Sequence, residues 1–372
     1  MSNADMIIEI LQAEGVEYLL GFPNNRLFNS AASHNIKPLI ARTERVAINM
    51  ADAYTRMHNG KKIGVVAVQD GPGIEASFPA VAQAYGDNTP ILVLPGAHAP
   101  AMQNYDPQFM ASRSFRDITK MATLVNDAGA IPRTMEMAFA AMRNGRTAPV
   151  LIETAVNLLW GRFKGDNPPA YQVQRAYRSQ AEASDVEQIL ASLLSAKRPV
   201  LVAGHGALYA EAWDELRELA ELLQIPVTTT LLGKSVFPEN HELALGTSGR
   251  TITKAAGHFV NESDFLLGIG TSFTINDFTA RMPKDAVLGQ ITNNPADIAK
   301  CRPVSCAAIG DARLVLQQLI SLAKETVGEN GRPKADDVIT EIATLHKDFF
   351  DEWSERLLCN DAGPISAYRV IH

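Results

Sequence analysis

One acidic residue opens an otherwise small and apolar helix near the start of the chain, and its carboxylate could do acid–base chemistry. Glu44 lies in the first turn of the stretch 41–59, Thr43 suits the N-cap position, and Gly60 is expected to end the helix. The residues expected on the buried face are Val46, Ala47, Met50, Ala51, Ala53, Tyr54 and Met57. From this helix alone, Glu44 is more simply interpreted as a carboxylate facing the positive end of the helix dipole.

Two glycine-containing loops follow apolar strands on either side of this helix. The first loop follows the strand expected at 16–20, and the second follows the buried strand expected at 62–68. Open α/β sheets place ligand loops at the carboxyl ends of their strands, so both loops are expected near Glu44. A Gly-Pro-Gly tripeptide is commonly only a tight turn before a helix, but beside Glu44 it is expected to let backbone approach a ligand. The loops are Gly21-Phe-Pro23-Asn24-Asn25 and Gln69-Asp70-Gly71-Pro72-Gly73.

Strands and helices alternate along most of the chain, which predicts α/β architecture with two doubly wound parallel-sheet domains. A stretch rich in proline and polar residues, including Gly165 and Asn167, separates the two alternating regions. The expected boundaries are a first domain at 1–160, a linker at 161–183, a second domain at 184–326, and a linker helix with the start of a further domain at 327–372.

The composition excludes several classes of protein. The chain has 372 residues, 46% of them hydrophobic, and a net charge of -7, which argues against nucleic acid or an anionic membrane as partner. Its three cysteines, Cys301, Cys306 and Cys359, fit no zinc motif and indicate a reducing compartment. Neither a signal peptide nor a membrane-spanning stretch is expected, so the protein is predicted to be cytoplasmic.

Several segments together resemble the acetolactate synthase-like family of thiamine-diphosphate enzymes. In the first domain these are Gly21-Phe-Pro, Arg42-Thr-Glu44-Arg, Ala51-Asp-Ala-Tyr-Thr-Arg56, Gly71-Pro-Gly73, Ala84-Tyr-Gly-Asp-Asn-Thr-Pro90 and Ala148-Pro-Val-Leu-Ile-Glu153. In the second domain they are Arg198-Pro-Val-Leu-Val-Ala-Gly204, Pro226-Val-Thr-Thr-Thr-Leu-Leu-Gly233 and Phe237-Pro-Glu-Asn-His241. The resemblance implies a pyrimidine-binding domain followed by a Rossmann-like middle domain.

Family members also have a third, diphosphate-binding domain with a Gly-Asp-Gly metal motif, which the resemblance does not find here. Gly86-Asp87-Asn88 matches a different family segment, and the tail from Gly363 through Ser366 to His372 resembles the opening of that third domain. The expected cofactor is therefore thiamine diphosphate with Mg²⁺, whose metal ligands would lie outside this chain. A homo-oligomer or a separate diphosphate-domain subunit is the implied partner.

The resemblance assigns Glu44 a catalytic role, because the matching family glutamate hydrogen-bonds the cofactor pyrimidine. A desolvated carboxylate that shares a proton with this ring can drive it to the imino form needed for carbanion chemistry. The expected cofactor-binding residues are Gly21, Pro23, Glu44, Gly71, Pro72 and Gly73. The candidate substrate residues are Asn24, Asn25, Gln69, Asp70, Gln108 and Phe109, with capping of the following helix as the alternative for Gln69 and Asp70.

The expected reaction is decarboxylation, carboligation or C–C lysis of a 2-oxo acid or 2-hydroxyacyl substrate. The alternative is a non-catalytic regulatory or nucleotide-binding subunit that keeps the two domains. Gly204-His205-Gly206 is an incomplete dinucleotide motif. Relatives use the middle domain for ADP, CoA or FAD or leave it empty, and an empty or ADP/CoA-type site is preferred here over FAD. The missing Gly-x-Gly-x-x-Gly pattern disfavours a nicotinamide dehydrogenase.

Overall fold

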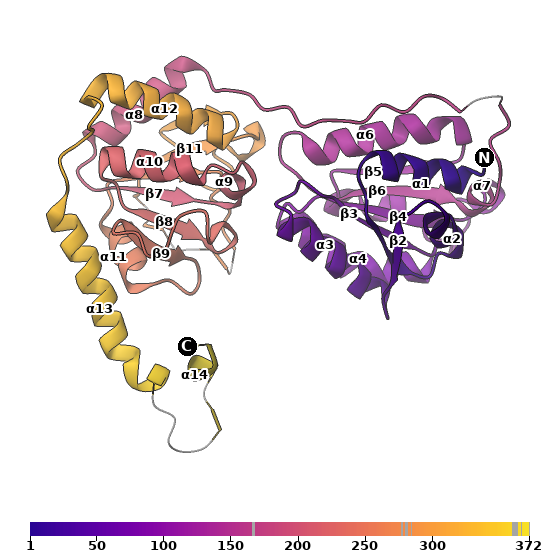
Figure 1. Cartoon of the computed structure of the whole chain (residues 1–372), viewed down its shortest axis with the longest axis horizontal. Helices are drawn as coiled ribbons and strands as arrows, with labels where there is room; N and C mark the ends of the chain where they lie inside the picture. Colours follow the sequence, from indigo (N-terminus) through magenta and orange to yellow (C-terminus); the bar gives the residue numbers. More distant parts are fainter. Residues whose placement is uncertain are drawn as a thin grey trace. The chain divides into compact units, whose positions relative to one another are not determined.

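The computed structural model forms two compact units, Met1–Tyr177 and Arg178–His372 (Figure 1). It describes residues 1–165, 168–276, 278–279, 282–283, 285–358, 364–365 and 367–371. The sequence predictions that involve Asn167, Cys359, Gly363, Ser366 and His372 lie outside these described residues. Of the other cysteines, Cys301 is exposed and Cys306 is buried, and both are free thiols.

The first unit is built on a parallel six-stranded sheet in the order β2-β1-β3-β4-β6-β5. Its strands are β1 (Tyr18–Phe22), β2 (Lys37–Ile40), β3 (Gly64–Val68), β4 (Ile91–Ala97), β5 (Met121–Val125) and β6 (Val150–Ala155). Its helices are α1 (Asn3–Ala13), α2 (Asn25–Ser33), α3 (Glu44–Met57), α4 (Pro72–Gly86), α5 (Ala111–Ser114), α6 (Ile131–Arg143) and α7 (Val156–Leu159). The strand order reverses between β1 and β3, which is where such sheets bind ligands.

Alternate residues of the central strands face two separate cores, so both faces of this sheet are covered. Val65 and Leu92 pack with α1, α2 and α6, whereas Val66 and Val93 pack with α3 and α4 (Figure 1). Burial on both faces explains why β3 and β4 are continuous apolar runs in the sequence.

The second unit has a parallel six-stranded sheet of its own, in the order β12-β11-β10-β7-β8-β9. Its strands are β7 (Pro199–Ala203), β8 (Val227–Thr230), β9 (Ala244–Ser248), β10 (Phe265–Ile269), β11 (Leu288–Thr292) and β12 (Cys306–Ile309). Its helices are α8 (Ala183–Ser195), α9 (His205–Tyr209), α10 (Trp213–Leu223), α11 (Lys254–Glu262), α12 (Ala312–Val327), α13 (Asp336–Leu358) and α14 (Ala367–Ile371). The two sheets confirm the predicted fold class. No helix within the described ranges is long and apolar enough to cross a membrane.

The buried face of α3 differs from the one predicted. Ala47 and Ala51 are buried as expected, but the other buried positions are Ile48, Asp52 and Thr55. The prediction was wrong for Val46, Met50, Ala53 and Met57, which are exposed, and Tyr54 is only partly buried. Hydrogen bonding makes the polar positions compatible with burial, since the Thr55 hydroxyl accepts a 2.8 Å bond from the Gly64 amide.

The C-terminal end of α3 is held by an ion-paired cluster. Arg56 donates to the Asp52 carboxylate at 2.8 and 3.1 Å and to Asp87, just after α4, at 2.7 Å. Burial opposes the charge on Arg56, but these hydrogen bonds outweigh it and raise the pKa of the guanidinium. The helix ends at Met57 because Asn59 and Gly60 adopt positive φ angles of 52° and 72°.

Replacing Gly21 with alanine is expected to lower the free energy of unfolding by about 3 kcal/mol or more. An added Cβ would lie 1.9 Å from the Ala67 carbonyl oxygen and 2.8 Å from Cζ of Phe28, so the β1–β3 pairing would have to shift. Urea denaturation followed by circular dichroism measures the change.

Gly86→Ala is the matched control, because no atom lies within 4 Å of its added Cβ. Its stability should be unchanged or higher by up to about 1 kcal/mol, since alanine favours helix. Equal unfolding midpoints for the Gly21 and Gly86 variants would contradict the close approach of β1 and β3.

Candidate functional site

Three neighbouring strands of the first unit end at the same sheet edge. Strand pairing places Phe22 beside Val68 and Val68 beside Pro95. The segments that follow β1, β3 and β4 therefore start side by side at the carboxyl edge, where the strand order reverses. This is the position expected for a ligand site in an open parallel sheet.

Glu44 is the first residue of α3 and lies at this edge, partly exposed. Thr43 caps the helix as predicted, with its hydroxyl accepting a 3.3 Å bond from the Val46 amide. An alanine Cβ at Gly73 would lie 3.4 Å from Oε1 of Glu44, so the second glycine loop passes next to the carboxylate. Within the described ranges, the Glu44 carboxylate has no hydrogen bond or ion pair, which leaves its oxygens available to a ligand.

Gly71 and Gly73 of the second loop are each required for a different structural reason. Gly71 is the N-cap of α4 and has a φ of 59°, a conformation that favours glycine. Gly73 is buried, and its added Cβ would lie 2.5 Å from Cγ of Gln69. Pro72 follows as the first, exposed residue of α4, and Pro23 is half-buried after β1.

The side chains of Gln69 and Asp70 do not cap α4, so the structure gives no support to that alternative interpretation. The N-cap residue is Gly71, and no side-chain capping bond is formed. Both side chains are half-buried at the sheet edge next to Gly71. They remain candidates for contact with a ligand.

The two asparagines after β1 occupy different environments. Asn24 is half-buried, and its side-chain amide donates a 3.2 Å bond to the carbonyl of Val68 at the end of β3. Asn25 is the exposed first residue of α2. The structure therefore brings Asn24 to the sheet edge, where it links the loop after β1 to the end of β3. The Asn25 side chain makes no hydrogen bond to a described residue at this edge.

A histidine that the sequence analysis did not select also lies at this edge. His98 follows β4 directly, and its Nδ1 lies 3.5 Å from Oδ2 of Asp70. Gly96 lets the β3 loop rest on β4, because an added Cβ would lie 3.3 Å from the Asp70 amide nitrogen. Only the strand pairing reveals this neighbour, since nothing in the sequence distinguishes His98 from the other histidines.

The segment between β4 and α5 is fixed by hydrogen bonds at both ends. Gln103 donates a 2.8 Å bond to the His98 carbonyl and exchanges amide hydrogen bonds with Asn126 at 2.9 and 3.0 Å. At the other end, the buried carboxylate of Glu153 accepts bonds from the Ala111 and Ser112 amides at 3.1 and 2.8 Å.

Gln108 and Phe109 lie within this segment. Phe109 packs partly buried against the core beneath α3 and α4, with its ring 6.4 Å from that of Phe115. Gln108 is half-buried, and its backbone amide donates a 2.7 Å hydrogen bond to the Tyr105 carbonyl. No described contact joins either side chain to Glu44.

In the second unit, the glycine loop after β7 packs directly on the end of β10. The Gly206 amide donates a 2.9 Å bond to the Gly270 carbonyl, and a Cβ at Gly206 would lie 2.9 Å from Cα of Gly270. The glycines Gly204 and Gly206 thus permit close backbone packing at the point where this strand order reverses.

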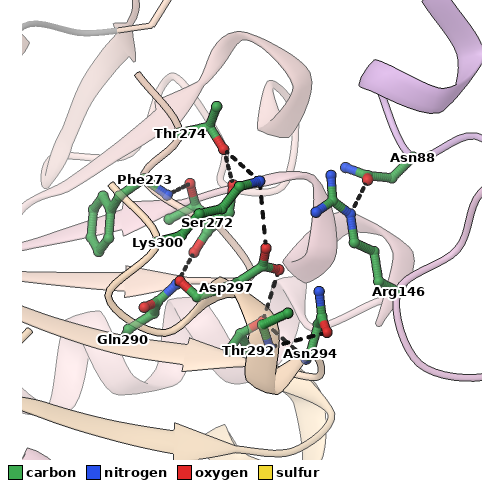
Figure 2. A network of polar contacts seen from close by, with 12 residues as sticks. Asn88, Arg146, Ser272, Phe273, Thr274, Gln290, Thr292, Asn294, Asp297 and Lys300 are labelled. Atoms are coloured by element: carbon green, nitrogen blue, oxygen red, sulfur yellow. Dashed lines mark hydrogen bonds and ion pairs between the residues drawn. The ribbon is translucent and has the colours of Figure 1, made fainter. Parts of the chain in front are cut away.

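Beside that point, polar side chains form a network among themselves (Figure 2). Gln290 on β11 donates to the carbonyls of Thr271 and Asp297 at 3.0 and 3.2 Å. Lys300 Nζ lies 3.9 Å from the Asp297 carboxylate and 3.4 Å from the Thr274 hydroxyl. Oε1 of Gln290 is buried and has no partner among the described residues. In the part of the chain that the structure describes, no group of three or more His, Cys, Asp or Glu side chains could hold a metal ion.

Comparison with known families matches both units. Residues 1–120 match the family described as thiamine pyrophosphate enzyme, N-terminal TPP binding domain. Residues 186–319 match the family described as thiamine pyrophosphate enzyme, central domain.

Curated relatives match across both units. The chain is 31% identical over 341 residues to the acetolactate synthase large subunit of Haemophilus influenzae, covering 87% of this chain and 58% of that protein. It is 32% identical over 333 residues to a Methanocaldococcus jannaschii protein named as a probable acetolactate synthase large subunit, covering 86% and 56%. It is also 31% identical over 336 residues to the glyoxylate carboligase of Escherichia coli O157:H7, covering 87% and 56%. The chain thus spans less than two thirds of each relative's length.

Among solved structures, a Mycobacterium smegmatis protein studied as a candidate thiamin diphosphate-dependent enzyme has the same fold. The TM-score is 0.74 at 23% identity, covering 87% of this chain and 63% of that one.

Glu153→Gln is expected to lower the free energy of unfolding by about 1–3 kcal/mol, because the new NH₂ group would face a backbone donor in a buried site. Hydrogen exchange at the Ala111 and Ser112 amides should become faster at the same time. Glu187→Gln, at an exposed position of α8, is the control and should change stability by less than about 0.5 kcal/mol. Unchanged exchange at both amides would show that Glu153 does not hold the segment.

Proposed function

Because this chain belongs to the thiamine pyrophosphate enzyme family, we propose that it supplies the cofactor-activating part of an enzyme that forms or breaks a C–C bond. The substrate class is a 2-oxo acid or 2-hydroxyacyl compound, and the reaction is decarboxylation, carboligation or lysis. The names of two relatives, acetolactate synthase and glyoxylate carboligase, favour carboligation with a 2-oxo acid donor. The site of action is proposed to be the cytoplasm.

The observation that carries this proposal is the position of Glu44. Its carboxylate has no described partner, starts a helix at the carboxyl edge, and lies beside the glycine loop of Gly71 and Gly73. These residues fit the pyrimidine part of thiamine diphosphate, because Glu44 offers an acceptor and Gly73, whose added Cβ would lie 3.4 Å from Oε1 of Glu44, brings a loop without a side chain next to it. When bound, the cofactor supplies a carbanion and an electron sink.

Glu44 would hold and move one proton at a ring nitrogen of the bound pyrimidine. A carboxylate does this best when water is excluded, since desolvation favours sharing of the proton. The glycine loop would bring backbone close to the ring without steric conflict, and Gly21 and Pro23 would shape the floor of the same edge. Asn24, Asn25, Gln69, Asp70, Gln108 and Phe109 are proposed to contact substrate.

A further domain is proposed to complete the site. Glu44 is only partly buried, and the outer face of α3 carries an exposed apolar stripe that includes Val46, Met50 and Met57. On α4, which packs against α3, Phe78 and Tyr85 are also exposed. A covering domain would remove this surface and the carboxylate from water together.

The proposed covering domain is a diphosphate-binding domain that also holds Mg²⁺. It would come from a partner subunit, including another copy in a homo-oligomer, or from a longer form of the protein. The 56–58% coverage of the relatives' length is compatible with either source.

A regulatory subunit that binds ADP, CoA or FAD in the central domain is the second candidate. The exposed Lys300 ammonium lies beside the Thr274 hydroxyl, and Oε1 of Gln290 is buried without a partner among the described residues; both favour a polar ligand at this edge. Titration calorimetry with each nucleotide tests it. Nucleotide binding together with no turnover after addition of a diphosphate domain would favour the regulatory function.

Glu44→Gln is expected to abolish thiamine-diphosphate-dependent turnover of pyruvate or glyoxylate, because an amide cannot take up the ring proton. The assay combines the full chain with a separately expressed diphosphate-binding domain from an acetolactate synthase relative, plus Mg²⁺. A loss of about 10²–10⁴-fold or more in kcat/KM is expected for a missing proton-transfer group.

Glu75→Gln is the matched control for the Glu44 variant. Glu75 is also an acidic residue in the first turn of a helix, in α4, but its side chain is exposed and has no role in the proposed site. Its variant should keep kcat/KM within about twofold of the wild type, far below the loss of about 10²–10⁴-fold expected for a missing proton-transfer group. Full turnover by Glu44→Gln would overturn the proposed function.

A further inference from the structure

We propose that His98 is a second catalytic residue of this site, with Asp70 as its positioning residue. The pair would exchange a proton with the carbonyl oxygen of the 2-oxo acid substrate. This inference rests on the proposed function and extends it to His98, which neither the family match nor the relatives' names assign, and it gives Asp70 a positioning role.

The first step of the argument is that strand pairing places the two side chains together at the same edge as Glu44. Asp70 follows β3, His98 follows the adjacent β4, and Nδ1 of the ring lies 3.5 Å from the Asp70 carboxylate. Along the β3 loop, Gln69 and Gly73 adjoin each other, and Gly73 adjoins Glu44. The pair is thus one short loop away from the carboxylate proposed to activate the cofactor.

Both side chains are partly sheltered but still accessible to a small ligand. The side chain of His98 is 23% exposed and that of Asp70 is 34% exposed. Among the described residues, the acidic group that lies within 4 Å of the His98 ring is the Asp70 carboxylate. Catalytic contacts are often long before substrate binds, so 3.5 Å can shorten to a hydrogen bond by a small rotation of the ring.

The backbone of His98 is held independently of its ring. The buried carboxamide of Gln103 donates to the His98 carbonyl and is itself fixed by the paired amide of Asn126. On the other side, Gly96 seats the Asp70 backbone against β4. Two strands and a buried amide therefore fix the backbone from which the ring projects, which limits the positions that the ring can take.

The proposed proton transfer is balanced. With Nδ1–H directed to the Asp70 carboxylate, the imidazolium would donate its Nε2 proton to the substrate carbonyl oxygen while the carbonyl carbon gains its new bond. The C=O π pair becomes the new O–H bond, and the ring is left neutral with its remaining proton on Nδ1. The proton returns to Nε2 when the C=O bond forms again in the product.

The first test needs no cofactor and uses the full chain labelled with ¹⁵N-histidine. In the wild type at pH 8, the ring ¹⁵N shifts of His98 should show the proton on Nδ1. Asp70→Asn should change these shifts toward a mixture of tautomers. Identical His98 shifts in the two proteins would overturn the role of Asp70.

The second test measures turnover in the chain combined with the diphosphate-binding domain, once wild-type activity is measured there. His98→Gln should lower kcat/KM by about 10²–10⁴-fold and remove one limb of the pH–rate profile, while the Kd for thiamine diphosphate stays unchanged. Asp70→Asn should cause a smaller loss and shift that limb.

His34→Gln is the matched control, because His34 also lies near a carboxylate, 3.8 Å from Glu9, but follows the C-terminal end of α2. It should leave turnover unchanged. If Glu44→Gln is inactive and His98→Gln keeps full activity, only the role of His98 is wrong. If Glu44→Gln keeps full activity, the proposed function itself is wrong, so the two failures can be told apart.

Discussion

The parallel pairing of β1, β3 and β4 is the constraint on which the rest of the first unit depends. It brings three strand ends to one line and so places the loops after Phe22, Val68 and Ala97 at one edge. That pairing requires Gly21, whose added Cβ would overlap the Ala67 carbonyl. The same residue that permits the sheet to form therefore also permits the site to assemble.

Helix α3 runs from the carboxyl ends of the strands back toward their amino ends. Its first residue, Glu44, stands at the edge proposed for chemistry, whereas Arg56 near its other end is fixed by Asp52 and Asp87. A helix anchored at its far end presents its first turn at a fixed height and rotation. The segment Ala51-Asp-Ala-Tyr-Thr-Arg56 thus helps to position Glu44, without contacting a ligand itself.

Much of the architecture could be predicted because strands covered on both faces are apolar throughout, as in β3 and β4. The edge strands β9 and β12 are harder to predict, since Cys306–Ile309 is short and half-exposed and β9 contains Gly246 at a φ of 84°. The buried face of α3 was misassigned because burial of Asp52 and Thr55 depends on hydrogen bonds, from Arg56 one turn further along the helix and from the Gly64 amide at the start of β3. His98 could not be identified from sequence, because only the pairing of β3 with β4 brings it close to Asp70.

Under the proposed function, the exposed apolar stripe on α3 would link assembly to reactivity. Val46 and Met50 lie within the two turns after Glu44, so the proposed covering domain would lie next to the carboxylate and would reduce its contact with water. By reciprocity, a cofactor that binds better to the dry site must strengthen the association of that domain by the same free energy. Subunit exchange would then slow as cofactor is added, and a chain left alone would be kept from generating a reactive carbanion in contact with water.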